Sequence, residues 1–220
     1  MLAAARPLPR EFYARGPRAL AMALLGRVLV HDDSHAGRLA GLIVETEAYG
    51  GRDDPASHAH RGPTPRNAVM FGPPGHAYVY FTYGMHHCFN VVCRPEGSAS
   101  AVLVRALEPV AGLAAMRRRR AVSEPHQLAR GPGSLARALG LDLRHDGLDL
   151  TRAPLWIADL PTRRGGCTVE RGPRIGIRLA AERPWRYWLA GSAFVSGPRR
   201  GAMADRPRGR PARARARRAR

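Results

Sequence analysis

The chain has 220 residues, of which 45% are hydrophobic, so it is long enough to bury a sizeable core. Its formal net charge of +19 lies far outside the usual range and predicts a polyanionic partner, either nucleic acid or an acidic membrane surface. All 36 basic residues are arginine, which excludes an imine formed on a lysine side chain. Three scattered cysteines exclude a disulfide framework, and no run of about 18 apolar residues is present to cross a membrane.

The start of the chain lacks a signal-peptide pattern, because Pro7, Pro9, Arg10 and Glu11 interrupt it early. We therefore expect a soluble cytoplasmic protein, nucleoid-associated if the chain is bacterial. Its expected partner is nucleic acid, with no membrane association.

The first third of the chain predicts a helix, a hairpin and a long loop. Residues 16–25 have the apolar spacing of a short amphipathic helix. Residues 28–31 and 39–48 are apolar runs on either side of a polar turn, so we expect paired strands. Residues 50–74 are rich in Gly, Pro, His and Asp, and a loop of this length in a compact domain is usually functional.

The rest of the chain mixes strands and helices without a regular alternation. Further strands are expected at 77–82, 89–93, 101–106, 154–158, 175–179 and 186–189, and helices at 109–120 and 134–139, the second capped near Gly133 or Ser134. This mixture favours an α+β fold in which residues 1–198 form one domain around a curved, mainly antiparallel mixed sheet. Residues 199–220 hold ten arginines, one aspartate and almost nothing to bury, so we expect a disordered tail that strengthens duplex binding without reading sequence.

The strand at 39–48 carries the first candidate site. Glu45 and Glu47 are two residues apart and therefore point to the same side of the strand, and Tyr49 follows on that side. A carboxylate fixed on a rigid strand suits a general base, and the aromatic ring offers a surface for a flat substrate. A solvated residue or a salt-bridge partner is the alternative, and the spacing does not choose between the two glutamates. The side chains that can converge on this face from neighbouring strands and loops are His58, Asn90 and Arg105.

Residues 78–84, with the sequence Tyr-Val-Tyr-Phe-Thr-Tyr-Gly, form the second candidate. Tyr78 and Tyr80 share one strand face, and Tyr83 precedes Gly84, where the chain can turn sharply. A packed aromatic strand is one interpretation, and a hairpin that pushes an aromatic wedge into stacked bases is the other. An exposed tyrosine at a glycine turn in a basic protein favours the wedge.

Two further clusters have competing interpretations. His58-Ala59-His60 with His86-His87-Cys88 and Cys93 suggests zinc, but the spacings fit no compact zinc pattern, so we expect no metal and no other cofactor. Thr64-Pro65-Arg66-Asn67 suits phosphate contacts from a loop, and equally the start of a helix with Thr64 as N-cap. Both can hold, because a helix N-terminus attracts phosphate.

The motifs occur in an order that resembles the alkyladenine DNA glycosylase family, also called 3-methyladenine DNA glycosylases. The resemblance covers roughly residues 10 to 197. Its motifs are Glu45-Thr46-Glu47-Ala48-Tyr49, His58, Thr64-Pro65-Arg66-Asn67, Tyr78-Val79-Tyr80, Tyr83-Gly84-Met85, Asn90, Arg105-Ala106-Leu107-Glu108-Pro109, Gly131-Pro132-Gly133-Ser134-Leu135, Arg174-Ile175-Gly176-Ile177, Gly191-Ser192 and Val195-Ser196. One departure is that His86 and His87 follow Met85, where the family often has larger aromatics, and these residues flank the wedge.

The resemblance implies a monofunctional DNA glycosylase of base excision repair. Such an enzyme flips a damaged purine from duplex DNA and hydrolyses its N-glycosidic bond, leaving an abasic site. The implied lesions are 3-methyladenine and 7-methylguanine, with hypoxanthine as a further candidate. The implied fold is one α+β domain with a curved antiparallel sheet and a protruding hairpin that intercalates into DNA.

By position, Glu47 would deprotonate the attacking water. The implied substrate-binding residues are Tyr49, His58, Tyr80, Asn90 and Arg105. Among these, Asn90 would discriminate against normal guanine and Arg105 would hold the flipped nucleotide. Tyr83 would fill the gap in the base stack, and the further DNA-binding residues would be Met85, Thr64, Arg66 and Asn67.

Two other functions stay open. A non-enzymatic architectural protein would use the Tyr83 wedge and the basic tail to bend duplex DNA. A metal-dependent nuclease would use His58, His60 and the region of Cys88. We expect a monomer whose partner is double-stranded DNA that contains damaged purines.

Overall fold

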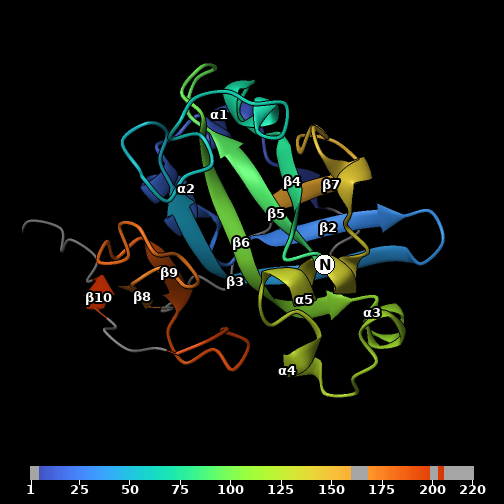
Figure 1. Cartoon of the computed structure of the whole chain (residues 1–220). Helices are drawn as coiled ribbons and strands as arrows, with labels where there is room; N and C mark the ends of the chain where they lie inside the picture. Colours follow the sequence, from blue (N-terminus) through green and yellow to red (C-terminus); the bar gives the residue numbers. More distant parts are fainter. Residues whose placement is uncertain (1–4, 160–167, 199–202, 206–220) are drawn as a thin grey trace, which may run out of the picture.

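The computed structural model describes residues 5–159, 168–198 and 203–205. The fold is α+β, with a curled antiparallel half-barrel sheet and a few short helices (Figure 1). The strands are β1 (Arg6–Pro7), β2 (Val28–Asp33), β3 (Gly37–Tyr49), β4 (Ala77–Thr82), β5 (His86–Cys93), β6 (Ser100–Ala111), β7 (Leu155–Asp159), β8 (Val169–Gly172), β9 (Arg186–Leu189) and β10 (Met203–Asp205). The helices are α1 (Arg10–Tyr13), α2 (Pro17–Leu24), α3 (Leu113–Arg120), α4 (Pro125–Leu128) and α5 (Pro132–Leu139), with 3₁₀ helices η2 (Ala68–Phe71) and η3 (Leu143–His145).

The sheet is organised around β3, which is its longest strand. The main order is β1-β7-β2-β3-β6-β5-β4, and β3 also pairs with β9, which leads through β8 to β10. In Figure 1 the strands β3, β6, β5 and β4 cross the centre, while β8, β9 and β10 lie together beside β3. The register of β3 against β6 shifts on both sides of Glu45, and such irregularities bend a strand and re-aim its side chains. The bend therefore lies where both candidate carboxylates stand.

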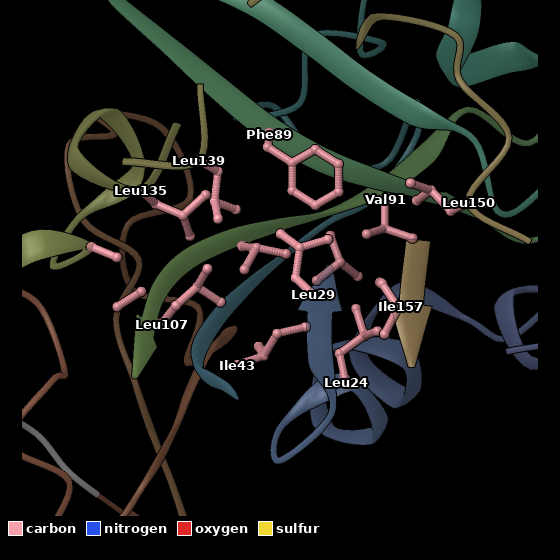
Figure 2. Packing of buried hydrophobic residues seen from close by; sticks show 14 of the residues in the cluster. Leu24, Leu29, Ile43, Phe89, Val91, Leu107, Leu135, Leu139, Leu150 and Ile157 are labelled. Atoms are coloured by element: carbon pink, nitrogen blue, oxygen red, sulfur yellow. The ribbon is translucent and has the colours of Figure 1, made fainter. Parts of the chain in front are cut away.

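The core fills the side of the sheet that faces α2 and α5. Figure 2 shows Leu24 of α2 and Leu135 and Leu139 of α5 pointing toward Ile43, Leu107 and Phe89 of the sheet. Side chains alternate across a strand, so the neighbours of core residues point to the opposite face. On β6 this alternation buries Val102 and Val104 in the core and turns Leu103 and Arg105 to the other side.

Several expectations from the sequence are confirmed. Helix α2 and the hairpin of β2 and β3 lie where the apolar runs predicted them, and β4 and β9 have the expected bounds. Within the described ranges every pairing between the named strands is antiparallel, so the expected mixed character of the sheet is not found there. None of the helices in these ranges is long and apolar enough to cross a membrane.

Other expectations are wrong. The predicted helix 109–120 begins only at Leu113, because β6 continues to Ala111 beside the long β3 and Gly112, with φ of 76°, turns the chain. Helix α5 starts at Pro132, two residues earlier than expected, and its N-cap is Gly131. No helix starts at Thr64, since the chain forms a turn there and η2 begins at Ala68.

The predicted strand 175–179 is also wrong, and β8 was not predicted. Residues 175–179 form bends, with Gly176 at φ of 78°. Within the segment expected as a tail, Met203–Asp205 pairs with β8 as β10, and the remainder of 199–220 lies outside the described residues.

Candidate active site

A cavity of about 310 Å³ opens on the face of the sheet opposite the core. This size suits a single flat base, since ligand pockets begin at about 300 Å³. The strands β3, β4, β5 and β6 contribute its floor, and the loops after β3 and after β8 contribute its rim. The residues expected in the substrate pocket all line it, namely Tyr49, His58, Tyr80, Asn90 and Arg105.

Glu47 lies directly behind the cavity wall. Its side chain has no exposed surface, and its three hydrogen-bonding or ion-pair partners all line the cavity. Oε1 accepts from the Ile175 amide at 2.7 Å and lies 3.2 Å from Arg105 Nη1, while Oε2 accepts from the Tyr49 hydroxyl at 2.9 Å. In the described part of the chain no second donor reaches Oε2, which leaves that oxygen one unused lone pair.

Glu45 shares the facing of Glu47 but not its surroundings. It is fully buried, and its oxygens accept from Arg105 Nε at 3.1 Å, Arg186 Nε at 2.6 Å and the Ser196 amide at 2.6 Å. Because Arg105 contacts both carboxylates, the expectation that the two glutamates share one side is confirmed. Arg186 and Ser196 do not line the cavity, so Glu45 is enclosed by the interior and serves to hold Arg105.

Charges in this network stabilise one another. Burial alone would lower the pKa of Arg105, but the charges of Glu47 and Glu45 raise it above the ordinary value. Burial raises the pKa of the Tyr49 phenol well above its ordinary value, and the nearby charge of Glu47 adds to this. Tyr49 therefore stays protonated and keeps donating to Glu47 throughout the physiological pH range.

An aromatic cluster forms another part of the wall. The Nδ1 of His58 is hydrogen-bonded to the Tyr78 hydroxyl at 2.8 Å, and the His58 and Tyr80 rings lie edge to face at 4.6 Å. Burial and then the charge of Arg66 lower the pKa of His58, so the imidazole is neutral at pH 7. Burial also raises the pKa of Tyr78, to about 12, and that of Tyr80.

Asn90 is held rigidly at the cavity. It is 4% exposed, and its amide nitrogen donates to the Tyr78 carbonyl at 3.0 Å across the β4–β5 pair. Cys88 lines the cavity as well, but burial raises the pKa of its thiol and so removes the thiolate that a nucleophile requires.

The hairpin between β4 and β5 presents an exposed aromatic beside the cavity. Tyr83 is 79% exposed with φ of 51°, Gly84 follows with φ of 68°, and Met85 is 69% exposed. Tyr83 also lines the cavity mouth. The packed-strand interpretation holds for Tyr78, which is 1% exposed, and not for Tyr83.

The loop residues expected to contact DNA differ in position. Arg66 donates to the Phe81 carbonyl at 2.8 Å and lies over the Tyr80 ring at 5.3 Å, and Thr64 is exposed. Asn67 is 2% exposed and donates to the carbonyls of His58 and Gly62, so its contacts lie inside the loop.

Two histidines of the candidate zinc cluster are hydrogen-bonded to other groups. His60 is hydrogen-bonded to the Arg52 carbonyl at 2.6 Å, whereas His58 bonds Tyr78. In the described ranges, no three His, Cys, Asp or Glu side chains come close enough together to hold a metal ion.

Sequence reasoning missed the residues that hold the site together. Arg174 and Asp54 form a buried ion pair beside Tyr49, and Arg186 and Ser196 enclose Glu45. Arg174 and Ile175 belong to a recognised motif, but nothing in their spacing predicts a partner 120 or more residues away.

A carboxylate with one unused lone pair, buried among residues that line a cavity of one-base size, can accept a proton from water, and an exposed aromatic at the mouth can stack on nucleic acid bases. The cavity and the exposed aromatic together suit a protein that acts on single bases of nucleic acid.

Comparison with known proteins narrows the class to a family. The family model of methylpurine-DNA glycosylase matches residues 11–193. A protein of Frankia casuarinae is 55% identical over 202 residues, covering 86% of this chain and 92% of its own. A protein of Bradyrhizobium diazoefficiens is 51% identical over 193 residues, covering 88% of this chain and 92% of its own. A protein of Anaeromyxobacter dehalogenans is 53% identical over 195 residues, covering 87% of each chain. All three carry the name "Putative 3-methyladenine DNA glycosylase".

The chain belongs to the methylpurine-DNA glycosylase family. It is therefore a DNA-repair glycosylase, a hydrolase that acts on N-glycosyl bonds.

Proposed function

We propose that this chain is a monofunctional glycosylase that flips an alkylated or otherwise damaged purine from duplex DNA and hydrolyses its N-glycosidic bond with water activated by Glu47. Its substrates are 3-methyladenine and 7-methylguanine, with hypoxanthine as the neutral lesion to be tested beside them. It acts as a monomer in the cytoplasm and leaves an abasic site.

The free lone pair on Oε2 of Glu47 is the observation that carries this proposal. Oε1 is occupied by the Ile175 amide and Arg105, so a water proton can be accepted only at Oε2. The same carboxylate lies close enough to the cavity to stabilise positive charge on the sugar as the base leaves. Tyr49 keeps Oε2 oriented by donating to it.

The cavity walls support recognition of a flipped purine. Stacking on Tyr49 and Tyr80 stabilises the flipped base by about 1–3 kcal/mol. This offsets the free energy needed to flip the base, which is smallest for damaged bases. Purines alkylated at N3 or N7 carry a positive charge, favour aromatic faces and leave without prior protonation. Asn90 is fixed by its bond to Tyr78, so it has no freedom to move aside for the exocyclic amino group of a normal guanine.

The absence of lysine supports a monofunctional enzyme. A strand-cleaving lyase that forms its imine on a lysine side chain is excluded, since the chain has none, and an imine mechanism would need the α-amino group of the N-terminus. Water activated by Glu47 is the nucleophile in this proposal. We further propose that Tyr83 fills the gap left in the base stack and that Thr64, Arg66 and Met85 contact the DNA around it.

The proposal is tested by chromatography of bases released from methylated duplex DNA, with and without a chelator. We expect 3-methyladenine and 7-methylguanine in the soluble fraction at the same rate in both conditions. Loss of release with the chelator would support the metal-dependent hydrolase instead. Tight binding and bending of the duplex with no released base would support the architectural protein.

A further inference from the structure

A buried arginine stands behind the cavity wall without lining the cavity. The Arg174 side chain has no exposed surface, and its guanidinium lies over the rings of Tyr49 at 4.7 Å and Trp185 at 5.2 Å. Its two terminal nitrogens donate to the two carboxylate oxygens of Asp54 at 2.6 and 2.8 Å. This is a bidentate pair, which fixes direction as well as distance.

The pair connects three parts of the cavity wall. Arg174 donates to the Ala48 carbonyl at 3.0 Å and so contacts the end of β3, where Tyr49 stands. Asp54 accepts from the Gly50 amide at 3.0 Å and belongs to the loop that leads to His58. The residue directly after Arg174 is Ile175, whose amide donates to Oε1 of Glu47.

We propose that Arg174, held by Asp54, is a positioning residue for the glycosylase reaction. It keeps the Ile175 amide on Oε1 of Glu47 and supports the Tyr49 ring from behind, so that Oε2 presents its free lone pair to water. The inference rests on the proposed role of Glu47.

The chemistry of the site requires arginine. A planar guanidinium can donate to both oxygens of Asp54 while it lies over the rings of Tyr49 and Trp185, whereas a lysine ammonium is a point charge that cannot form the same bidentate pair. Burial would raise the pKa of Asp54, but the bonds from Arg174 and the Gly50 amide more than offset this and hold it below its ordinary value. The pair is therefore ionised at neutral pH.

The test uses Arg174→Lys in the full chain. Single-turnover release of 7-methylguanine is measured, together with equilibrium binding to a duplex that carries a stable abasic-site analogue. Displacing a catalytic group by about 1 Å can cost about 100-fold in rate, so we expect release to slow by about 10- to 100-fold. Binding should change by less than about threefold, because the pair does not line the cavity.

Arg183→Lys is the matched control. Arg183 also lies over Trp185, at 4.9 Å, and its Nη1 is 3.8 Å from Asp54, but a third of its side chain is exposed. We expect its release rate to stay within about twofold of the wild type, since exposed ion pairs contribute little.

A double mutant separates positioning from a general structural effect. If Arg174 acts through Glu47, Arg174→Lys should not slow the residual release that remains in Glu47→Gln, because coupled residues are not additive. Wild-type release in Arg174→Lys would overturn the proposal, and so would an equal slowing in both backgrounds. If Arg174→Lys is not folded at the assay temperature by circular dichroism, Asp54→Asn carries the same expectations. A wild-type protein that releases no base would instead overturn the proposed function.

Discussion

Glu45→Gln tests how the buried charge network is stabilised. Every group that contacts the Glu45 oxygens is a nitrogen donor, namely Arg105, Arg186 and the Ser196 amide. A glutamine side chain has one acceptor oxygen, and its amide nitrogen is a donor. Whichever way the amide group is turned, this nitrogen faces another donor. No partner in this group can reverse its role, since none carries an acceptor on the bonding atom.

The stability lost in Glu45→Gln is set by the burial of the Glu45 side chain. Leaving one buried donor unsatisfied costs about 1–3 kcal/mol, and removing one partner of a buried ion pair costs about 3–5 kcal/mol. These costs describe the same lost contacts and do not add, so we expect Glu45→Gln to lower the free energy of unfolding by about 3–5 kcal/mol. For a domain of this size that corresponds to a fall in Tm of roughly 6–20 °C.

The same substitution at Glu47 should cost less stability than at Glu45. One of the three partners of Glu47 is the Tyr49 hydroxyl, which can turn and accept from the new amide group. Arg105 also keeps its contact with Glu45. We therefore expect Glu47→Gln to cost only about 1–3 kcal/mol.

Thermal and denaturant unfolding followed by circular dichroism measure both variants. The surface control is Glu182→Gln, whose side chain is 77% exposed, and we expect a change within about 0.5 kcal/mol. Glu45 does not stabilise the buried network in the way described if Glu45→Gln is as stable as this control, or if Glu47→Gln is the less stable of the two buried variants.

Two further predictions concern the hairpin and the pH dependence of stability. Tyr83→Ala should leave Tm unchanged but weaken binding to lesion-containing duplex by the value of one stacked base, about 1–3 kcal/mol, measured by fluorescence anisotropy. Unchanged affinity relative to Leu143→Ala, an exposed residue of η3, would argue against the wedge. Burial lowers the pKa of His31, whose Nε2 lies 3.3 Å from that of His145, so the unfolded chain binds the proton first, at its ordinary pKa of about 6.5. The free energy of unfolding should therefore be highest above that pH and fall as the pH drops below it toward the folded-state pKa of His31. In His31→Gln this fall should be shallower. An identical slope of stability against pH in both proteins would contradict this.

The parts of the site that depend on strand alternation could be predicted from the sequence. Glu47 and Tyr49 share a face because they are two residues apart on one strand. Asn90 and Arg105 join them because neighbouring antiparallel strands present their alternate residues to the same face. The first relation is local, whereas the second also requires that β3, β6 and β5 are neighbours in the sheet.

The parts that depend on distant segments could not be predicted. Glu45 and Glu47 differ because the Arg186 side chain of β9 and the Ser196 amide donate to the first and not to the second. The apolar residues Ile175 and Ile177 predicted a strand. Instead, the Ile175 amide donates a hydrogen bond to the Glu47 carboxylate, and the backbone turns at Gly176. Tertiary contacts of this kind override local propensity.

The central claim is that Glu47 activates the water that cleaves the glycosidic bond. The most direct measurement is single-turnover release of 7-methylguanine by Glu47→Gln at saturating enzyme, beside its affinity for duplex with a stable abasic-site analogue. We predict that release falls by about 10²- to 10⁴-fold, the contribution of a general base, while affinity stays within a few-fold of the wild type. Release at the wild-type rate by the folded variant would contradict the account.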